Sequence, residues 1–359
     1  MSASPQPYLP RMVRDWDEEA PGQLHQCLEG SMVFVDISGF TAMSERLAKH
    51  GKLGAEELTA VIAATFHELL AAAYSFGASL LKFGGDALLL FFAGDQHAIR
   101  SCAAARAMQQ RLDEVGVCVT SAGKVTLRMS VGIHSGMFDF FLVGGSHREL
   151  IVSGPAATRT VEMEGAARAG QVLLSSGTAD AIPALNRGRP SGPGVLLRGA
   201  MEVESAARRH VESSPDALAQ FVPIGLCQLL LSGEVEPEHR PATVAFLQHH
   251  GLDDIIERDG AEVAAERLDS LIRVVQEAVD ARSITFLATD IATNGGKIIL
   301  AAGVPSTTGN DEEEMLLALR RVISSGPALP ISVGVTWGRV FAGEVGTPYR
   351  RTYTVMGDT

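Results

Sequence analysis

Two parts of the chain repeat one another in the same order, and this internal repeat constrains the fold more than any other feature of the sequence. Four pairs of segments match, first copy then second: 33–39 with 245–251, 84–89 with 295–300, 131–136 with 333–338, and 152–154 with 355–357. The apolar runs and glycine turns in each part predict two copies of one βαββαβ unit. The copies differ at their acidic positions, since Asp36 and Asp86 of the first align with Gln248 and Lys297 of the second.

Patterning within the copies predicts an α+β fold and four segments. For the first copy we expect strands at 31–40, 79–83, 87–92 and 125–133, helices at 42–76 and 96–115, a turn at 134–136 and a hairpin-like segment at 138–152. The predicted segments are a leader at 1–28, a first domain at 29–185, a linker at 186–240 rich in Arg, Pro, Gly and Glu at both ends, and a second domain at 241–359.

Composition excludes several classes of function. The chain has 359 residues, with 30 basic and 42 acidic side chains. A formal charge of -12 argues against nonspecific attraction to nucleic acid or to an anionic membrane surface. Four cysteines without a CxxC pair suit a reducing compartment. The N-terminus lacks the pattern of a signal peptide, and the purest apolar run, 87–93, is far below the ~20 residues of a membrane helix. We therefore expect a cytoplasmic protein without nucleic-acid or membrane partners.

The two aspartates of the first copy suggest metal-dependent phosphate chemistry. Asp36 ends an apolar strand and precedes a helix, whose first backbone N–H groups and Gly39 suit a phosphate. Asp86 lies at a glycine-rich hairpin tip. Carboxylates at adjacent strand ends can share two Mg²⁺ or Mn²⁺ ions. Each motif alone is also common in ordinary turns, so the prediction depends on the pair.

These motifs resemble a known family. FVDISGFT at 34–41, LKFGGDALLLFF at 81–92 and VGIHSG at 131–136 resemble the class III nucleotide cyclase catalytic domain. ISVGVTWGRVFAGEVG at 331–346 and RRTYTVMGDT at 350–359 resemble its partner domain, as in the bicarbonate-stimulated soluble adenylyl cyclases and their bacterial relatives. The resemblance implies two ferredoxin-like domains that form a pseudo-symmetric intramolecular pair. It also implies conversion of ATP to cyclic AMP and pyrophosphate with two metal ions.

The resemblance assigns roles to particular residues. The implied metal ligands, catalytic in the case of the aspartates, are Asp36, Ile37 and Asp86. The implied phosphate contacts are Ser38, Gly39, Phe40 and Thr41, with Arg128 replacing the family's basic residue because Ser130 stands at its position. Thr354 is implied to read the base, and Lys297 is the lysine nearest the family's base-contacting one. Lys82 and Arg159 are implied to form a second, bicarbonate-like regulatory site.

The departures from the family pattern leave other functions open. Segment 285–291 contains no lysine, and the family's transition-state asparagine and arginine follow the Gly-Asp-Thr at which this sequence stops. We therefore expect a second domain that is incomplete at its C-terminus and of low activity. An alternative is a catalytically weak or inactive module that senses nucleotide or bicarbonate in a longer signalling protein. A diguanylate-type cyclase is a third, weaker hypothesis, because Ala87-Leu88 follows Gly84-Gly85-Asp86 in place of Glu-Phe.

Overall fold

The computed structural model describes residues 6–84, 87–203, 219–232, 237–347 and 350–357. The elements of the first half are η1 (Gln6–Tyr8), α1 (Arg11–Glu19), β1 (His25–Ser38), α2 (Phe40–Ala48), α3 (Gly51–Ser75), β2 (Ser79–Gly84), β3 (Ala87–Ala93), α4 (His97–Val115), β4 (Val117–Thr120), β5 (Gly123–Thr126), β6 (Arg128–Val143), β7 (Glu149–Ser153), α5 (Pro155–Ala166), β8 (Val172–Leu174), α6 (Ser176–Asp180), η2 (Ala184–Asn186), β9 (Arg187–Ser191) and β10 (Gly194–Leu197). Those of the second half are η3 (Ala219–Phe221), α8 (Ile224–Ser232), β11 (Glu238–His250), α9 (Leu252–Asp259), α10 (Ala261–Asp280), β12 (Thr285–Ala292), β13 (Gly295–Ala302), α11 (Asp311–Ser324), β14 (Ile331–Thr347) and β15 (Arg350–Met356).

Each half of the chain builds one large sheet, and the two large sheets share a strand order; the first half also forms a separate two-stranded sheet of β4 and β5. The second sheet runs β12-β13-β11-β14-β15, and the first contains β2-β3-β1-β6 with β7 also paired to β6. The register agrees as well, because Phe34 faces Leu89 and Gly132 while Phe246 faces Ile299 and Gly334. The first sheet continues beyond β6 through β8, β10 and β9.

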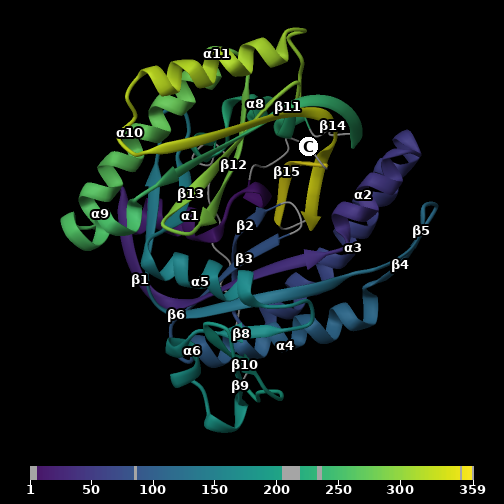
Figure 1. Cartoon of the computed structure of the whole chain (residues 1–359), viewed down its shortest axis with the longest axis vertical. Coiled ribbons are helices and arrows are strands. Elements are labelled where there is room, and N and C mark those ends of the chain that lie inside the picture. Colours follow the sequence, from purple (N-terminus) through teal and green to yellow (C-terminus); the bar gives the residue numbers. More distant parts are fainter. Residues whose placement is uncertain (1–5, 85–86, 204–218, 233–236, 348–349, 358–359) are drawn as a thin grey trace.

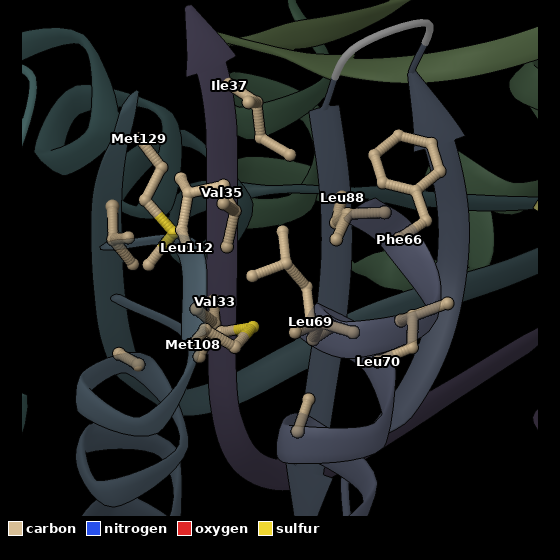
Figure 2. Packing of buried hydrophobic residues seen from close by; sticks show 14 of the residues in the cluster. Val33, Val35, Ile37, Phe66, Leu69, Leu70, Leu88, Met108, Leu112 and Met129 are labelled. Carbon is tan, nitrogen blue, oxygen red and sulfur yellow. The ribbon is translucent and has the colours of Figure 1, made fainter. Parts of the chain in front are cut away.

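The core of the first copy lies between its sheet and helices α3 and α4. Alternate residues of β1, among them Val33 and Val35, point toward the helices and are fully buried. Figure 2 shows these side chains against Phe66 and Leu69 of α3 and Met108 of α4. Helix α3 is long and apolar enough to cross a membrane by composition, but its apolar residues at helical spacing pack in this core.

The two copies exchange their long hairpins. Phe341 and Val345 of β14 are buried in the core of the first copy, while Phe141 of β6 and Ile151 of β7 are buried in the core of the second. A third apolar cluster lies between the sheets and includes residues of η1–α1, with Trp16 almost fully buried. Figure 1 shows this arrangement, with α10 and α11 in the upper part of the view, α4 in the lower half and α1 between the sheets.

Several expected boundaries differ from the structure. Strand β1 starts inside the expected leader, and α2 and α3 divide the expected helix at 42–76. The expected turn at 134–136 is wrong, because β6 passes through it and Ser135 pairs with Ser31 of β1, their hydroxyl oxygens 2.6 Å apart. Part of the expected linker belongs to the first sheet as β9 and β10. Pro190 is tolerated there because β9 is an edge strand.

Candidate functional site

Asp36 lies two residues before the end of β1, on the face of the first sheet that is turned toward the second. Its neighbours Val35 and Ile37 point into the helical core and are fully buried. Asp36 therefore points to the opposite face, as does Phe34, which packs in the cluster between the sheets. The carboxylate is half-buried, and burial raises its pKa above the usual range. Among the described residues it has no side-chain hydrogen-bond partner, so its oxygens are available to a cation.

The segment after Asp36 opens the N-terminus of α2. Gly39 has a φ of 112°, a conformation that side chains other than glycine rarely adopt. A Cβ there would lie 3.1 Å from Leu127 Cδ2 and 3.3 Å from the Thr126 oxygen. Phe40 anchors the helix by packing edge-on against Phe66, with ring centroids 6.0 Å apart. The first turn of α2 carries no acidic residue, so its backbone N–H groups and dipole suit an anion.

The remaining expected residues of the first copy lie nearby in different ways. Ile37 offers only its backbone, since its side chain is fully buried. Ser38 donates to the Arg128 carbonyl oxygen at 3.3 Å, and Arg128 is exposed on the same face of the sheet as Asp36. Thr41 lies within α2. Asp86 falls outside the described residues.

A carboxylate that the sequence analysis missed lies beside this site. Ser130 is opposite Asp36 in the β1–β6 register, and its hydroxyl donates to Glu164 Oε1 of α5 at 2.9 Å. Burial raises the pKa of Glu164, with a further contribution from the negative charge of Asp36, while the hydrogen bond from Ser130 opposes the shift. No sequence signal distinguished Glu164 from Glu162, because the covered face of α5 is set by its packing on β6.

The second copy carries opposite chemistry at the corresponding position. Lys297 lies across from both Gln248 and Asp290 in the second sheet. The register places Lys297 at the counterpart of Ala87, one residue from the expected match with Asp86. Burial raises the pKa of Asp290, while the charge of Lys297 lowers it. A cation therefore stands where the first copy has Ala87, directly across from Asp36.

The N-terminus of the helix that follows this position carries two acidic residues and is already engaged by other side chains. Asp253 and Asp254 occupy the first turn of α9, the counterpart of α2. Thr158 of α5 donates to Asp253 Oδ2 at 2.6 Å and accepts from the Asn294 backbone at 2.8 Å. These contacts fill the second copy's helix N-terminus, whose carboxylates would repel a phosphate.

The two residues expected to bind the base do not come together. Thr354 lies on β15 opposite Gly343 and is half-buried, with its hydroxyl 3.4 Å from the Val355 oxygen. Lys297 lies on β13, and β11 and β14 intervene in the sheet. At about 4.8 Å per strand the two backbones are roughly 14 Å apart. Thr354 and Lys297 are therefore too far apart to contact the same edge of a base.

The expected regulatory pair is also separated. Lys82 donates to Glu149 Oε1 at 2.8 Å and contacts the Thr289 hydroxyl, with its side chain only 10% exposed. Arg159 is 63% exposed and pairs with Glu162 on its own helix at 2.9 Å. The described residues show no contact between Lys82 and Arg159. The sequence analysis missed Glu149, whose contacts depend on three separate strands.

A cavity of about 100 Å³ lies where the copies meet. Its lining includes Lys82, Glu149, Thr289, Thr352 and Arg350. Arg350 is buried, donates to the Leu81 oxygen at 3.2 Å and lies over the Phe83 ring. No group of three or more His, Cys, Asp or Glu side chains is placed to hold a metal ion within the part of the chain that the structure describes.

Comparison with known proteins identifies the family. Residues 23–211 match the family model described as the adenylate and guanylate cyclase catalytic domain, which is more than half of the 359 residues. The chain belongs to this family. The match covers the first copy, including Asp36, the α2 N-terminus and the extension through β9 and β10.

Two curated relatives and one solved structure are similar to this chain. Adenylate cyclase type 10 of Mus musculus is 27% identical over 175 residues, which is 47% of this chain and 11% of the relative. The Homo sapiens protein of the same name is 28% identical over 152 residues, 41% of this chain and 9% of the relative. The chain thus spans about a tenth of the length of these relatives. The crystal structure of a class III adenylyl cyclase-like ATP-binding protein from Pseudomonas aeruginosa shares the fold at 12% identity, with a TM-score of 0.60 over 93% of this chain and 80% of that one.

Proposed function

We propose that this chain is a cytoplasmic adenylyl cyclase that converts ATP to cyclic AMP and pyrophosphate at a single site, formed by the first copy together with the second. The observation that carries the proposal is the position of Asp36 beside the open N-terminus of α2, on the face turned toward the second sheet. The two halves are proposed to act as a pseudo-symmetric pair of cyclase domains, and their shared strand order and exchanged hairpins support this.

The residues of the first copy have distinct proposed roles. The Asp36 carboxylate, the Ile37 carbonyl and Asp86 would hold two Mg²⁺ or Mn²⁺ ions. When bound, these ions supply charge neutralisation of the triphosphate and activation of the attacking ribose oxygen. The backbone N–H groups after Gly39 would hold phosphate oxygens, with Arg128 at the exposed edge. The half-buried carboxylate of Asp36 fits a divalent cation because it is not satisfied by a described hydrogen bond.

The base and the second site complete the proposal. Thr354 would hydrogen-bond the adenine edge, which favours ATP over GTP because the wrong base would leave polar groups unpaired. Lys297 is not included among the proposed base contacts, since it lies on β13 across from Gln248 of β11. Bicarbonate is not included either, because Lys82 already holds a carboxylate.

A second candidate is a module that binds ATP without turnover. Ala288 stands at the register counterpart of Lys82 in the second sheet, so β12 offers no lysine to the base. The similar Pseudomonas aeruginosa protein is itself described as adenylyl cyclase-like and ATP-binding. ATP binding without cyclic nucleotide formation would support this candidate.

The test measures nucleotide binding and cyclic AMP and cyclic GMP formation separately, with Mg²⁺ and with Mn²⁺. Asp36→Asn removes one charged ligand and should lower metal-dependent turnover by ~10²-fold or more, at an unchanged Tm. The matched control is Asp254→Asn, which removes an exposed carboxylate from the corresponding helix of the second copy. Equal turnover in Asp36→Asn and the control would contradict the site assignment.

A further inference from the structure

A buried network joins the two copies at Lys82. Lys82 Nζ lies 2.8 Å from Glu149 Oε1, and the Thr289 hydroxyl donates to the same carboxylate oxygen at 2.7 Å. Lys82 and Glu149 come from β2 and β7 of the first copy, while Thr289 comes from β12 of the second. The side chains of Lys82 and Glu149 are 10% and 15% exposed. The three groups form a closed triangle across the interface.

The repeat provides an internal comparison. Lys82 and Ala288 both follow a bulge in their strands, and the register makes them counterparts. Glu149 lies opposite Val143 and has Thr352, opposite Val345, as its counterpart. The second copy thus has neither the cation nor the anion, and the fold forms without them. The pair is therefore a feature of one side of the interface and not a requirement of the strand order.

The charge balance at this position depends on Glu149. A buried ammonium is costly unless an anion lies beside it. Burial raises the pKa of Glu149, but the charges of Lys82 and His147 and the hydrogen bonds outweigh it, and the pKa is lowered overall. His147 Nε2 lies 3.9 Å from Glu149 Oε2, and burial lowers the pKa of this imidazole, so Lys82 is the stronger partner of the carboxylate. Glu149 is thus the partner that neutralises Lys82.

The space around the pair can hold a small ligand. The 100 Å³ cavity is lined by Lys82, Glu149 and Thr289, by the two arginines Arg148 and Arg350, and otherwise mainly by apolar side chains such as Leu150 and Leu287. A cavity can hold a water molecule once roughly 10–15 Å³ is open to it, so this cavity together with the volume of a deleted carboxylate is large enough for an anion of a few heavy atoms.

We propose that the Glu149 carboxylate occupies the anion-binding position on Lys82 and links the two copies through its hydrogen bond with Thr289. In the native chain Glu149 fills this position, so small carboxylates and other oxyanions cannot bind to Lys82 there. Removal of the carboxylate creates a site for a small carboxylate from solution. The inference goes beyond the proposed function and does not depend on turnover of ATP.

The experiment is chemical rescue of stability in the full chain, with formate as the probe and chloride replaced at constant ionic strength. Glu149→Ala should lower Tm by about 5–10 °C, as expected when one partner of a buried pair is removed. Formate should restore a large part of this loss saturably. Glu149→Gln should not respond to formate, because the amide fills the same space. The double variant Lys82→Met/Glu149→Ala should recover part of the Tm and lose the formate response.

Glu162→Ala is the matched control, because it removes a carboxylate from the exposed pair with Arg159. It should change Tm by less than ~2 °C and show no specific formate effect. A Glu149→Ala chain with native Tm, or one that formate stabilises no more than it stabilises the control or the double variant, would overturn the proposal. If Glu149→Ala does not fold, formate in the refolding buffer should recover folded chain. The proposal would also be overturned if formate failed to recover folded Glu149→Ala chain while Glu149→Gln folded with the Tm of the native chain.

Discussion

Gly132 and Gly334 are counterparts in the two copies, and the structure predicts opposite results when each is changed to alanine. Gly132 lies on β6 beneath α5, where a Cβ would stand 2.2 Å from the backbone nitrogen of Glu164 and 2.7 Å from its Cα. Gly334 lies on β14, where a Cβ would meet no atom of the described residues within 4 Å. The two substitutions therefore add the same methyl group to the same strand position in two different environments.

The expected magnitudes follow from these distances. An ordinary contact of a Cβ is about 3.4–4 Å, so α5 would have to move by more than ~1 Å, and a helix backbone cannot rotate away as a side chain can. Its Thr158 is also bound to Asp253 of the second copy. We expect Gly132→Ala to lower the free energy of unfolding by ~3 kcal/mol, the upper end of the range for overpacking. Gly334→Ala should raise it by about 0.5–1 kcal/mol, because alanine restricts the unfolded chain more than glycine does.

The assay is urea unfolding of both variants and the native chain, followed by circular dichroism and tryptophan fluorescence. The comparison is the difference between the two variants, since it cancels the intrinsic effect of the added methyl group. Similar losses in both variants would refute the reasoning that α5 packs on the first sheet while the corresponding face of β14 is open. A gain in Gly132→Ala would refute it equally.

Two more predictions concern stability. Phe141→Ala should lower the free energy of unfolding by ~3–5 kcal/mol in one cooperative transition, because this side chain of the first copy is fully buried in the second copy's core. The control Leu316→Ala changes an exposed side chain and should alter the free energy of unfolding by less than ~0.5 kcal/mol. Two separate transitions in the native chain would contradict the exchange of hairpins between the copies. Burial lowers the pKa of His134 and His249 to about 4, so the folded chain binds fewer protons than the unfolded chain between about pH 6.5 and 4. The free energy of unfolding should therefore fall as pH falls through this window. In a pH series of urea titrations His249→Gln should make this fall less steep, and an unchanged slope would contradict the prediction.

The order of elements could be predicted from the sequence because strand and helix periods repeat in both copies. The turn at 134–136 could not be excluded, since Gly136 in a polar triplet is a typical turn signal. In the structure Gly136 faces Gly30 in the β1–β6 register. A Cβ at Gly30 would lie 2.5 Å from the Phe92 oxygen, so Gly30 is needed for the close approach of β1 and β3. A Cβ at Gly136 would lie nearest the His134 ring, 3.2 Å from its Nε2, and Gly136 lies in an extended strand and does not reverse the chain.

The site was predicted only where its residues are local in sequence. Asp36, Gly39 and the start of α2 follow one another along the chain, so their proximity needed no tertiary contact. Glu149 acquires its role from strands 67 and 140 residues away, which no local pattern reveals. Lys297 was shifted by one position because the β12–β13 pairing continues for two residue pairs beyond Asp290 and Lys297, while the described β2–β3 pairing ends at Gly84 and Ala87. Only the strand register fixes which residues correspond.

The same backbone thus occurs twice with opposite electrostatics, and this difference decides how many nucleotide sites the pair can have. In the first copy a carboxylate for cations precedes a helix whose first turn has no acidic residue. In the second, Gln248 replaces the carboxylate, Lys297 lies across from it, and Asp253 and Asp254 occupy the helix start. A metal-bound triphosphate needs anionic ligands for the metal and an uncharged or positive helix end for the phosphates. The first copy meets both conditions and the second meets neither, so binding should saturate at one metal–nucleotide complex per chain, as isothermal titration with a non-hydrolysable ATP analogue can measure. A stoichiometry of two would show that the acidic helix end does not exclude phosphate.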